Sequence, residues 1–181
     1  MRKIVLLLIS LSLITACSTA TSNETSGKQA QLKAPSTCEQ PEVIKAFNDQ
    51  VEGSIYVPTD WQPSEGTDLY DVYQVGGIAC TYGIQVAEVG GTVMWASNTD
   101  NLWDRKKTQW LADGQVEIDL PGLDEEDAVI LKEGSTGADE MHIWGVNLLI
   151  NNVWIQVNAS FLQNIDEAMP IIKATIKSLK A

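Results

Sequence analysis

The sequence predicts an α+β domain: an antiparallel sheet on which an N-terminal, a middle and a C-terminal helix pack, in an α/β/α sandwich-like arrangement. Two observations lead to this prediction. Apolar residues recur with helical spacing near both ends of the domain, in Pro41–Gln50 and Ile165–Lys180. Between them lie short runs rich in β-branched and aromatic residues, separated by glycine or asparagine pairs, which is typical of antiparallel hairpins.

The first helix is predicted over Pro41–Gln50. Pro41 suits a first helical turn, and Val43, Ile44 and Phe47 fall on one face. A short extended piece follows at Ile55–Val57. Residues 59–67 have the composition of an exposed loop.

Three strands are predicted next, joined by tight glycine-containing turns; they cover Leu69–Val75, Ile78–Ala87 and Thr92–Ser97. In the middle strand, alternation should direct one set of side chains into the core. That set is Cys80, Tyr82, Ile84 and Val86.

The second half begins with a helix predicted over Asp100–Ala112 and capped by Thr99 or Asp100. Strands are then expected at Gln115–Leu120, at Ala128–Lys132, and in a hairpin that pairs His142–Ile150 with Val153–Ala159. Asn151 and Asn152 suit a hairpin turn with positive φ.

The last helix is predicted over Ile165–Lys180, with one apolar stripe formed by Ile165, Met169, Ile172, Ile176 and Leu179. Pro170 interrupts the pattern. It should either kink the helix or begin it.

The N-terminus has the features of an export signal. Arg2 and Lys3 precede an apolar run over residues 4–13, which is too short to span a membrane. Ile14-Thr15-Ala16-Cys17 then resembles the bacterial lipobox. The resemblance implies cleavage before Cys17, a diacylglycerol on its sulfur, and acyl chains such as palmitate that anchor the protein to the membrane. The alternative is an ordinary cleaved signal followed by a coincidental cysteine.

These features divide the chain into a signal peptide over residues 1–16, an acylated cysteine with a flexible tether over 17–36, and one globular domain over 37–181. Ser18 to Ala34 contain one large apolar residue, Leu32, so the segment cannot bury enough surface to offset the entropy of ordering. The expected location is the outer face of the cytoplasmic membrane.

Charge limits the partners. Twelve basic residues oppose 24 acidic ones, for a net charge of −12. A strongly acidic chain is a poor candidate for binding nucleic acid or anionic lipid surfaces. Solubility outside the cell is the simpler explanation.

Two cysteines remain in the domain, Cys38 and Cys80. An even pair in an exported domain predicts a disulfide. A redox or nucleophilic role would require a lowered thiol pKa, which Glu39 and Glu42 beside Cys38 would oppose.

No familiar catalytic or metal-binding motif appears, so neither a catalytic residue, a metal site nor a cofactor is predicted. The single histidine, His142, lacks a recognisable nucleophile or further zinc ligands. The acidic run Asp124–Asp127 lacks the ligand spacing of a calcium loop and is interpreted as a solvated turn.

Six tryptophans are available for packing or contact. Trp61 lies in the loop over 59–67 and is the candidate for a contact surface. Trp103 and Trp110 share a helical face with Lys106, which is interpreted as core with the lysine reaching outward rather than as an aromatic and basic patch.

One wider resemblance covers roughly Cys38–Ala181. A cysteine before a helix, a second cysteine in "GGIACTY" with Tyr82 two residues on, "PGLDEEDA" and a C-terminal helix resemble small cell-surface lipoproteins of high-G+C Gram-positive bacteria. Many of those families have no assigned function. Their shape is similar to the α/β/α sandwich of Mog1 and PsbP-like proteins.

The function expected from these features is that of a membrane-anchored extracytoplasmic module that binds a ligand or an envelope protein or glycan without catalysis. Two alternatives remain. One is an anchored envelope hydrolase that uses carboxylates, and the other is a carrier of a lipid or other hydrophobic ligand, which would require a cavity between sheet and helices.

Overall fold

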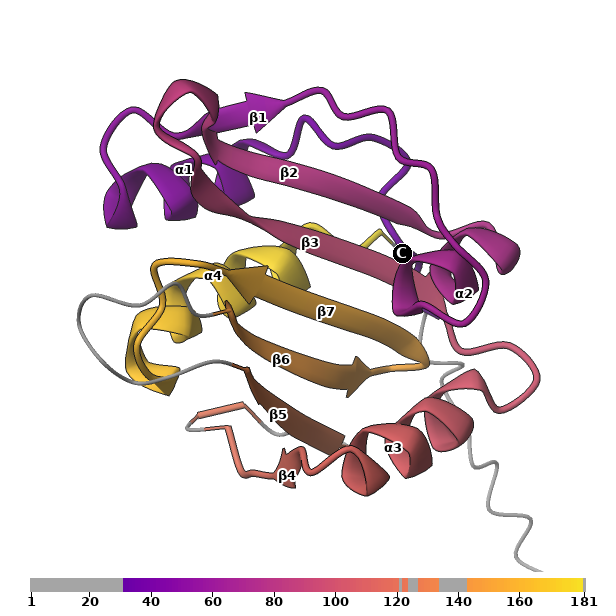
Figure 1. Cartoon of the computed structure of the whole chain (residues 1–181). Coiled ribbons are helices and arrows are strands. Elements are labelled where there is room, and N and C mark those ends of the chain that lie inside the picture. Colours follow the sequence, from indigo (N-terminus) through magenta and orange to yellow (C-terminus); the bar gives the residue numbers. More distant parts are fainter. Residues whose placement is uncertain (1–30, 121, 124–126, 134–142, 181) are drawn as a thin grey trace, which may run out of the picture.

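The computed structural model describes residues 31–120, 122–123, 127–133 and 143–180. This part of the chain forms one seven-stranded antiparallel sheet in the order β1-β2-β3-β7-β6-β5-β4, with four α-helices (Figure 1). The elements are α1 (Pro41–Gln50), β1 (Ile55–Val57), α2 (Asp68–Gln74), β2 (Ile78–Ile84), β3 (Val89–Ser97), α3 (Leu102–Ala112), β4 (Val116–Glu117), β5 (Asp127–Glu133), β6 (Ile143–Ile150), β7 (Val153–Ala159) and α4 (Ile165–Lys177).

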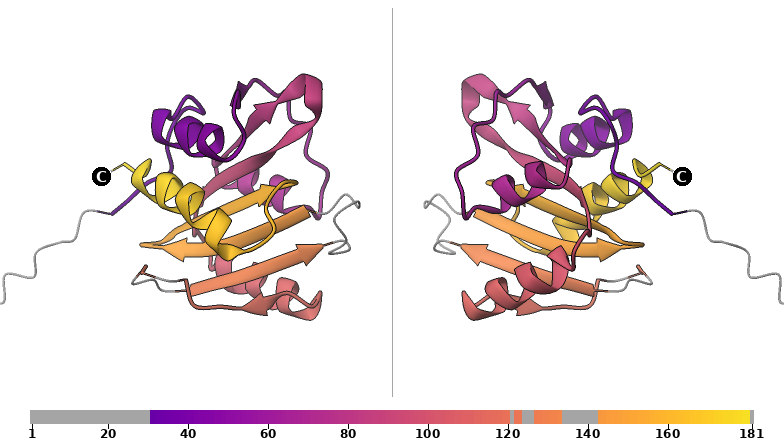
Figure 2. Two further views of the ribbon diagram at one scale, coloured as in Figure 1. Left: turned by 90° about the vertical axis from the view of Figure 1, so that its left-hand side faces the viewer. Right: turned by 90° about the vertical axis from the view of Figure 1, so that its right-hand side faces the viewer.

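The helices cover both faces of the sheet, which makes the α/β/α arrangement expected from the sequence. Helices α1 and α4 lie on one face and α2 and α3 on the other (Figure 2). Two separate hydrophobic clusters follow from this division, one on each side of the sheet. The α+β prediction is therefore confirmed, with α2 as a fourth helix that the sequence did not indicate.

The larger cluster lies between the sheet and helices α1 and α4. Phe47 of α1 stacks on Tyr82 of β2 with ring centroids 5.0 Å apart. Cys38 and Cys80 form the predicted disulfide, which ties the segment before α1 to the centre of β2. The Tyr82 hydroxyl donates a hydrogen bond to the Cys38 carbonyl at 2.7 Å, so this tyrosine also ties the segment to the sheet.

The smaller cluster is built on tryptophan. Trp103 and Trp110 of α3 are buried, and Trp110 lies 5.3 Å from the ring of Trp154 on β7. The interpretation of the shared face of α3 as core is correct. Lys106, however, does not reach outward: its side chain is only 5% exposed and lies in an ion-pair cluster.

The strand predicted at Leu69–Val75 is wrong, because this segment forms helix α2. Thr67 caps the helix: its hydroxyl accepts the Tyr70 N–H, and Asp68 and Asp71 lie in the first turn. Capping and packing of the buried Val72 override the β propensity of the tyrosines and valines.

The strand predicted at Ile78–Ala87 is shorter than expected, since β2 ends at Ile84 and residues 85–87 form a 3₁₀ turn. Cys80 and Tyr82 face the core as predicted. Val86 does not; it is 95% exposed because the alternation ends with the strand.

The capping prediction for the middle helix is also wrong. Helix α3 begins after Asn101, and the side-chain oxygen of Asn98 accepts the Trp103 N–H at 2.8 Å. Asp100 and Asn101 instead adopt positive φ in the preceding turn. Asn98, four residues before the first residue of the helix, therefore takes the role expected of Thr99 or Asp100.

The late hairpin is confirmed. Strands β6 and β7 pair in register from Trp144–Ala159 to Ile150–Val153, and Asn151 and Asn152 have positive φ. The predicted strand at Gln115–Leu120 is reduced to the two residues of β4, at the sheet edge.

Pro170 lies inside α4, so it does not begin the helix. The turn before it is held by a reciprocal cap: the Asn164 side chain accepts the Glu167 N–H, and the Glu167 carboxylate accepts the Gln163 N–H. Burial of Ala168 and Met169 further stabilises this first part of α4. The stripe confirmed as buried includes Met169, Ile172 and Leu179.

The boundary placed at residue 37 is corrected. Lys33 and Lys180 form an isolated antiparallel bridge, with N–H···O distances of 2.7 and 3.0 Å. Leu32 and Ala34 pack against the larger cluster. The folded domain therefore includes residues from about 32 onward, and the chain enters it beside the end of α4 (Figure 2).

Candidate functional site

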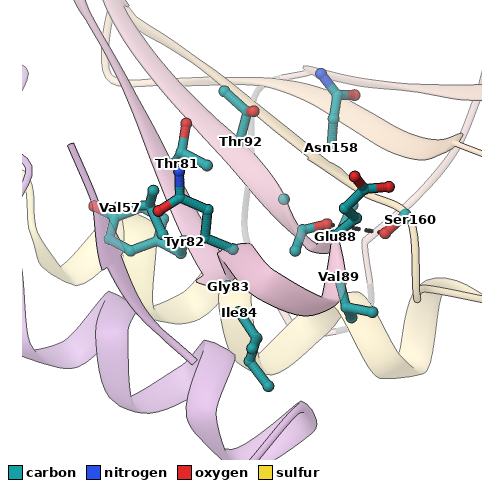
Figure 3. Close-up of a pocket in the computed structure, with 14 residues that line it drawn as sticks. Val57, Thr81, Tyr82, Gly83, Ile84, Glu88, Val89, Thr92, Asn158 and Ser160 are labelled. Atoms are coloured by element: carbon teal, nitrogen blue, oxygen red, sulfur yellow. Dashed lines mark hydrogen bonds between the residues drawn. The ribbon is translucent and has the colours of Figure 1, made fainter. Parts of the chain in front are cut away.

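Helices α2 and α3 cover only part of their face of the sheet. Their cluster includes Ala79, Met94, Ala96 and Trp154, which lie toward one end of the central strands. Toward the other end, β2, β3 and β7 line a hollow with a volume of about 420 Å³ (Figure 3). This hollow has the size of a small-molecule site.

A polar row crosses the floor of the hollow. Register places Thr81 of β2 opposite Thr92 of β3, and Thr92 opposite Asn158 of β7. In Figure 3 these three side chains point to the side away from α1 and α4. Val57 of the edge strand β1 is paired with Thr81 and extends the row with an apolar side chain.

One end of the hollow lies near the turn that joins β2 and β3, and the backbones approach so closely there that glycine is required. Gly83 and Gly90 are paired on β2 and β3, and a Cβ atom on Gly83 would overlap the Val89 carbonyl oxygen. Glycine in a strand often marks a place where a ligand or backbone approaches closely. Glu88 and Ser160 complete this end, and the Ser160 hydroxyl donates to the Gly90 carbonyl at 3.2 Å.

Beside the hollow, an ion-pair cluster lies under α2 and α3. The Lys106 ammonium group is 2.6 Å from Asp68 and 3.0 Å from Asp71. Burial lowers the pKa of Lys106, but the hydrogen bonds and charges of Asp68 and Asp71 raise it by more, so the net pKa is above its usual value. Lys106 is therefore a fixed positive charge at neutral pH.

Asp68 anchors a chain of hydrogen bonds that leads to the hollow. It accepts the Trp110 indole N–H at 3.0 Å and the Gln156 amide N–H at 2.7 Å. Because an ionised carboxylate only accepts, Gln156 must direct its nitrogen to Asp68 and its oxygen to Asn158, whose nitrogen donates at 2.8 Å. The ion-pair cluster thus sets the orientation of an amide on the floor of the hollow.

Asn158 is held closely on its other side as well. A Cβ atom on the paired Gly145 would overlap the Asn158 side-chain oxygen. That oxygen is buried and accepts no hydrogen bond from a described residue. Asn158 is thus a rigid part of the floor, positioned by Gln156 and by the absence of a side chain at Gly145.

A second hollow of about 690 Å³ lies between α1 and the edge strand β1. It is bordered by Ile44, Lys45, Ile55 and Tyr56. The hydroxyl of Ser54 is buried there and has no hydrogen-bond partner among the described residues. No chain of fixed polar groups leads into this hollow from the described contacts, in contrast to the hollow on β2, β3 and β7.

The structure does not bring the residues singled out in the sequence to one site. Cys17, His142 and residues 124–126 lie outside the described residues. Cys38 and Cys80 are in the larger cluster. Trp61 packs partly against the tryptophan cluster, and its indole N–H is buried without a hydrogen-bond partner among the described residues. The rest of the side chain is partly exposed, so a contact surface at Trp61 stays a prediction.

The floor residues Thr81, Thr92 and Asn158 were missed. Their signal was available in part: in the run Ile78–Ala87 the set opposite the core-facing one contains Thr81 and Gly83. Alternation alone assigns such a set to solvent. The hollow exists because helices α2 and α3 cover only part of this face of the sheet, which leaves Thr81, Thr92 and Asn158 beside an open space.

Comparison with protein-family models, with curated proteins and with solved structures gives no significant match to this chain. Within the described residues, no helix is long and apolar enough to cross a membrane. Nor does any group of three or more His, Cys, Asp or Glu side chains in that part of the chain form a potential metal site.

Proposed function

We propose that this protein is a membrane-anchored extracytoplasmic binding module, attached through lipid on Cys17, and that its ligand lies in the hollow on β2, β3 and β7. The observation that carries the proposal is the hollow itself: it has a volume of about 420 Å³, a row of oriented polar side chains on its floor and paired glycines at one end. The export signal and the lipobox resemblance support the location.

The lining favours an uncharged amphiphilic ligand. Thr81, Thr92 and Ser160 offer hydroxyl groups, while Val57 offers an apolar side chain beside the paired glycines. Ile84 and Val89 also border the hollow, but their side chains point toward the helices on the other face (Figure 3). Glu88 contributes a carboxylate, which would repel an anion. A molecule with an apolar part and several hydroxyl groups matches this combination of polar and apolar lining. The hollow lies beyond α2 and α3, so it is not the cavity between sheet and helices that the carrier alternative requires.

The test uses 1-octanoylglycerol as an uncharged amphiphilic probe and octanoate as its anionic counterpart. Titration of the ¹⁵N-labelled protein with octanoylglycerol should shift the amide signals of Gly83, Gly90 and Gly91, with weaker shifts for octanoate because Glu88 repels it. Thr92→Trp should abolish these shifts by filling the hollow. Thr108→Trp, on the exposed face of α3, should leave them unchanged.

Shifts that survive in Thr92→Trp, or that centre on the second hollow between α1 and β1, would contradict the assignment of the site. A lack of shifts with both probes would contradict the amphiphilic ligand class.

A further inference from the structure

Four exposed lysines surround the point where the chain enters the folded domain. Lys173 and Lys177 are four residues apart near the end of α4, so they lie on one side of the helix. Lys180 follows three residues after the last residue of α4. Lys33 comes from the entering segment and is held opposite Lys180 by the backbone bridge. We call Lys33, Lys173, Lys177 and Lys180 the lysine patch.

Among the described residues, one lysine of the patch pairs with a carboxylate. Lys33, Lys173 and Lys180 form no ion pair with any described residue, and the contact of Lys177 with Glu42 is long, at 3.7 Å, and exposed. Like charges placed directly opposite across a strand pair destabilise it, as Lys33 and Lys180 are placed. The helix dipole explains a lysine at the end of α4 but not Lys33, which belongs to another segment.

The position of the lysine patch relative to the proposed tether suggests what these charges bind. It lies where the entering segment meets the end of α4, on the α1 and α4 side of the sheet (Figure 2), whereas the polar row of the hollow points away from α1 and α4 (Figure 3). We propose that the lysine patch rests on anionic phospholipid headgroups of the membrane that carries the anchor, so that the hollow faces away from that membrane. This inference rests on the proposed attachment at Cys17.

Acidic side chains far from the patch do not oppose this contact, whereas Glu42 of α1 lies beside it. At physiological salt the Debye length is about 8 Å, so acidic side chains on the far face of the domain are screened from the membrane. Each lysine near an anionic surface contributes roughly a fivefold gain in partitioning. Residues 17–30 span at most about 50 Å, which keeps the patch at a high local concentration near the surface.

The experiment bypasses acylation. A ¹⁵N-labelled chain beginning at Cys17 is coupled through that thiol to a maleimide lipid in nanodiscs, while Cys38 and Cys80 stay in their disulfide. A gadolinium-chelating lipid broadens amide signals near the surface. With phosphatidylglycerol present, broadening should be strongest at Lys173–Lys180 and absent at Gly83 and Gly90. With phosphatidylcholine alone, or at high salt, this preference should disappear.

Two variants with the same charge change serve as test and control. Replacement of Lys33, Lys173 and Lys180 by glutamine should remove the oriented broadening and reduce binding of the untethered domain to phosphatidylglycerol vesicles roughly a hundredfold at low salt. Replacement of Lys45, Arg105 and Lys107 by glutamine should reduce binding far less and preserve the orientation.

Equal losses in both variants, equal orientation on phosphatidylcholine, or broadening centred on the hollow would each overturn the proposal. Failure of fatty-acid labelling at Cys17 would instead overturn the anchor, and failure of octanoylglycerol binding would overturn the ligand. The orientation, the anchor and the ligand are therefore each tested by a different experiment, and one can be wrong while the others stand.

Discussion

At the scale of single residues, the ion-pair cluster under α2 and α3 has the most direct energetic consequence. Lys106 is buried and is shared by Asp68 and Asp71, which are partly exposed, with 23% and 32% of their side-chain surface accessible. Removing one partner of a buried pair leaves uncompensated charge, whereas exposed pairs contribute little.

We therefore expect Lys106→Ala to lower the free energy of unfolding by about 2–3 kcal/mol, below the value for fully buried pairs because water reaches both carboxylates. Urea denaturation checks the value. Lys45→Ala, which removes an exposed ion pair with Asp49 on α1, should cost about 0.5 kcal/mol or less. Similar losses for both variants would show that burial does not strengthen the cluster.

Tyr82 predicts a pH dependence. Burial, and to a smaller extent Tyr56, raises the pKa of Tyr82 well above its ordinary value. A raised pKa in the folded state means that the contribution of Tyr82 to stability is complete below the ordinary tyrosine pKa of about 10 and is lost as the pH rises above it.

In an alkaline titration followed by absorbance at 295 nm, we expect Tyr82 to ionise only together with the loss of the circular dichroism signal. In Tyr82→Phe, the late absorbance step should be absent and the hydrogen bond to the Cys38 carbonyl lost. Ionisation of Tyr82 while the fold stays intact would contradict this expectation.

At the scale of elements, the disulfide joins two pieces that local sequence cannot bring together. Cys38 and Cys80 are separated by 42 residues, and their Cα atoms lie 5.4 Å apart. The loop-entropy relation gives a stabilisation of about 4 kcal/mol for a loop of this length.

Reduction, or the double replacement Cys38→Ser with Cys80→Ser, should lower the free energy of unfolding by about 3–4 kcal/mol while the fold persists. Thermal denaturation with and without reductant measures the effect. Two titratable thiols in the natively exported protein would show that the bond does not form in its own compartment, and would reopen a redox or nucleophilic role.

The entering segment is the second element with a measurable contribution. Pro35 is buried, and Leu32 and Ala34 pack on the larger cluster. A chain beginning at Thr37 should be less stable than one beginning at Gln31 by about 1–2 kcal/mol, because this apolar contact is lost. Equal melting temperatures would restore the domain boundary to residue 37.

At the scale of the whole molecule, the proposed anchor at Cys17 would decide where the domain acts. Metabolic labelling with a fatty-acid analogue should label the exported protein and leave Cys17→Ala unlabelled, and only the former should partition into detergent. Equal labelling of both proteins would contradict attachment at Cys17.

How much of this molecule the sequence determines depends on how local the physical cause is. Helices α1 and α4 and the hairpin of β6 and β7 were predictable, since apolar spacing and the turn at Asn151 and Asn152 act within a few residues. The cysteine pair was predictable because few cysteines leave few choices. The proposed export and anchoring also rest on a short contiguous motif ending at Cys17.

Tertiary structure decided the rest. Helix α2 has a strand-like composition, and its cap at Thr67 and the packing of Val72 overrode it. The ion-pair cluster joins Asp68 to Lys106, and the hollow joins β2, β3 and β7, across distances along the chain that no local pattern encodes. Lys106 was misjudged because burial depends on what packs above a residue, which only the assembled layers fix.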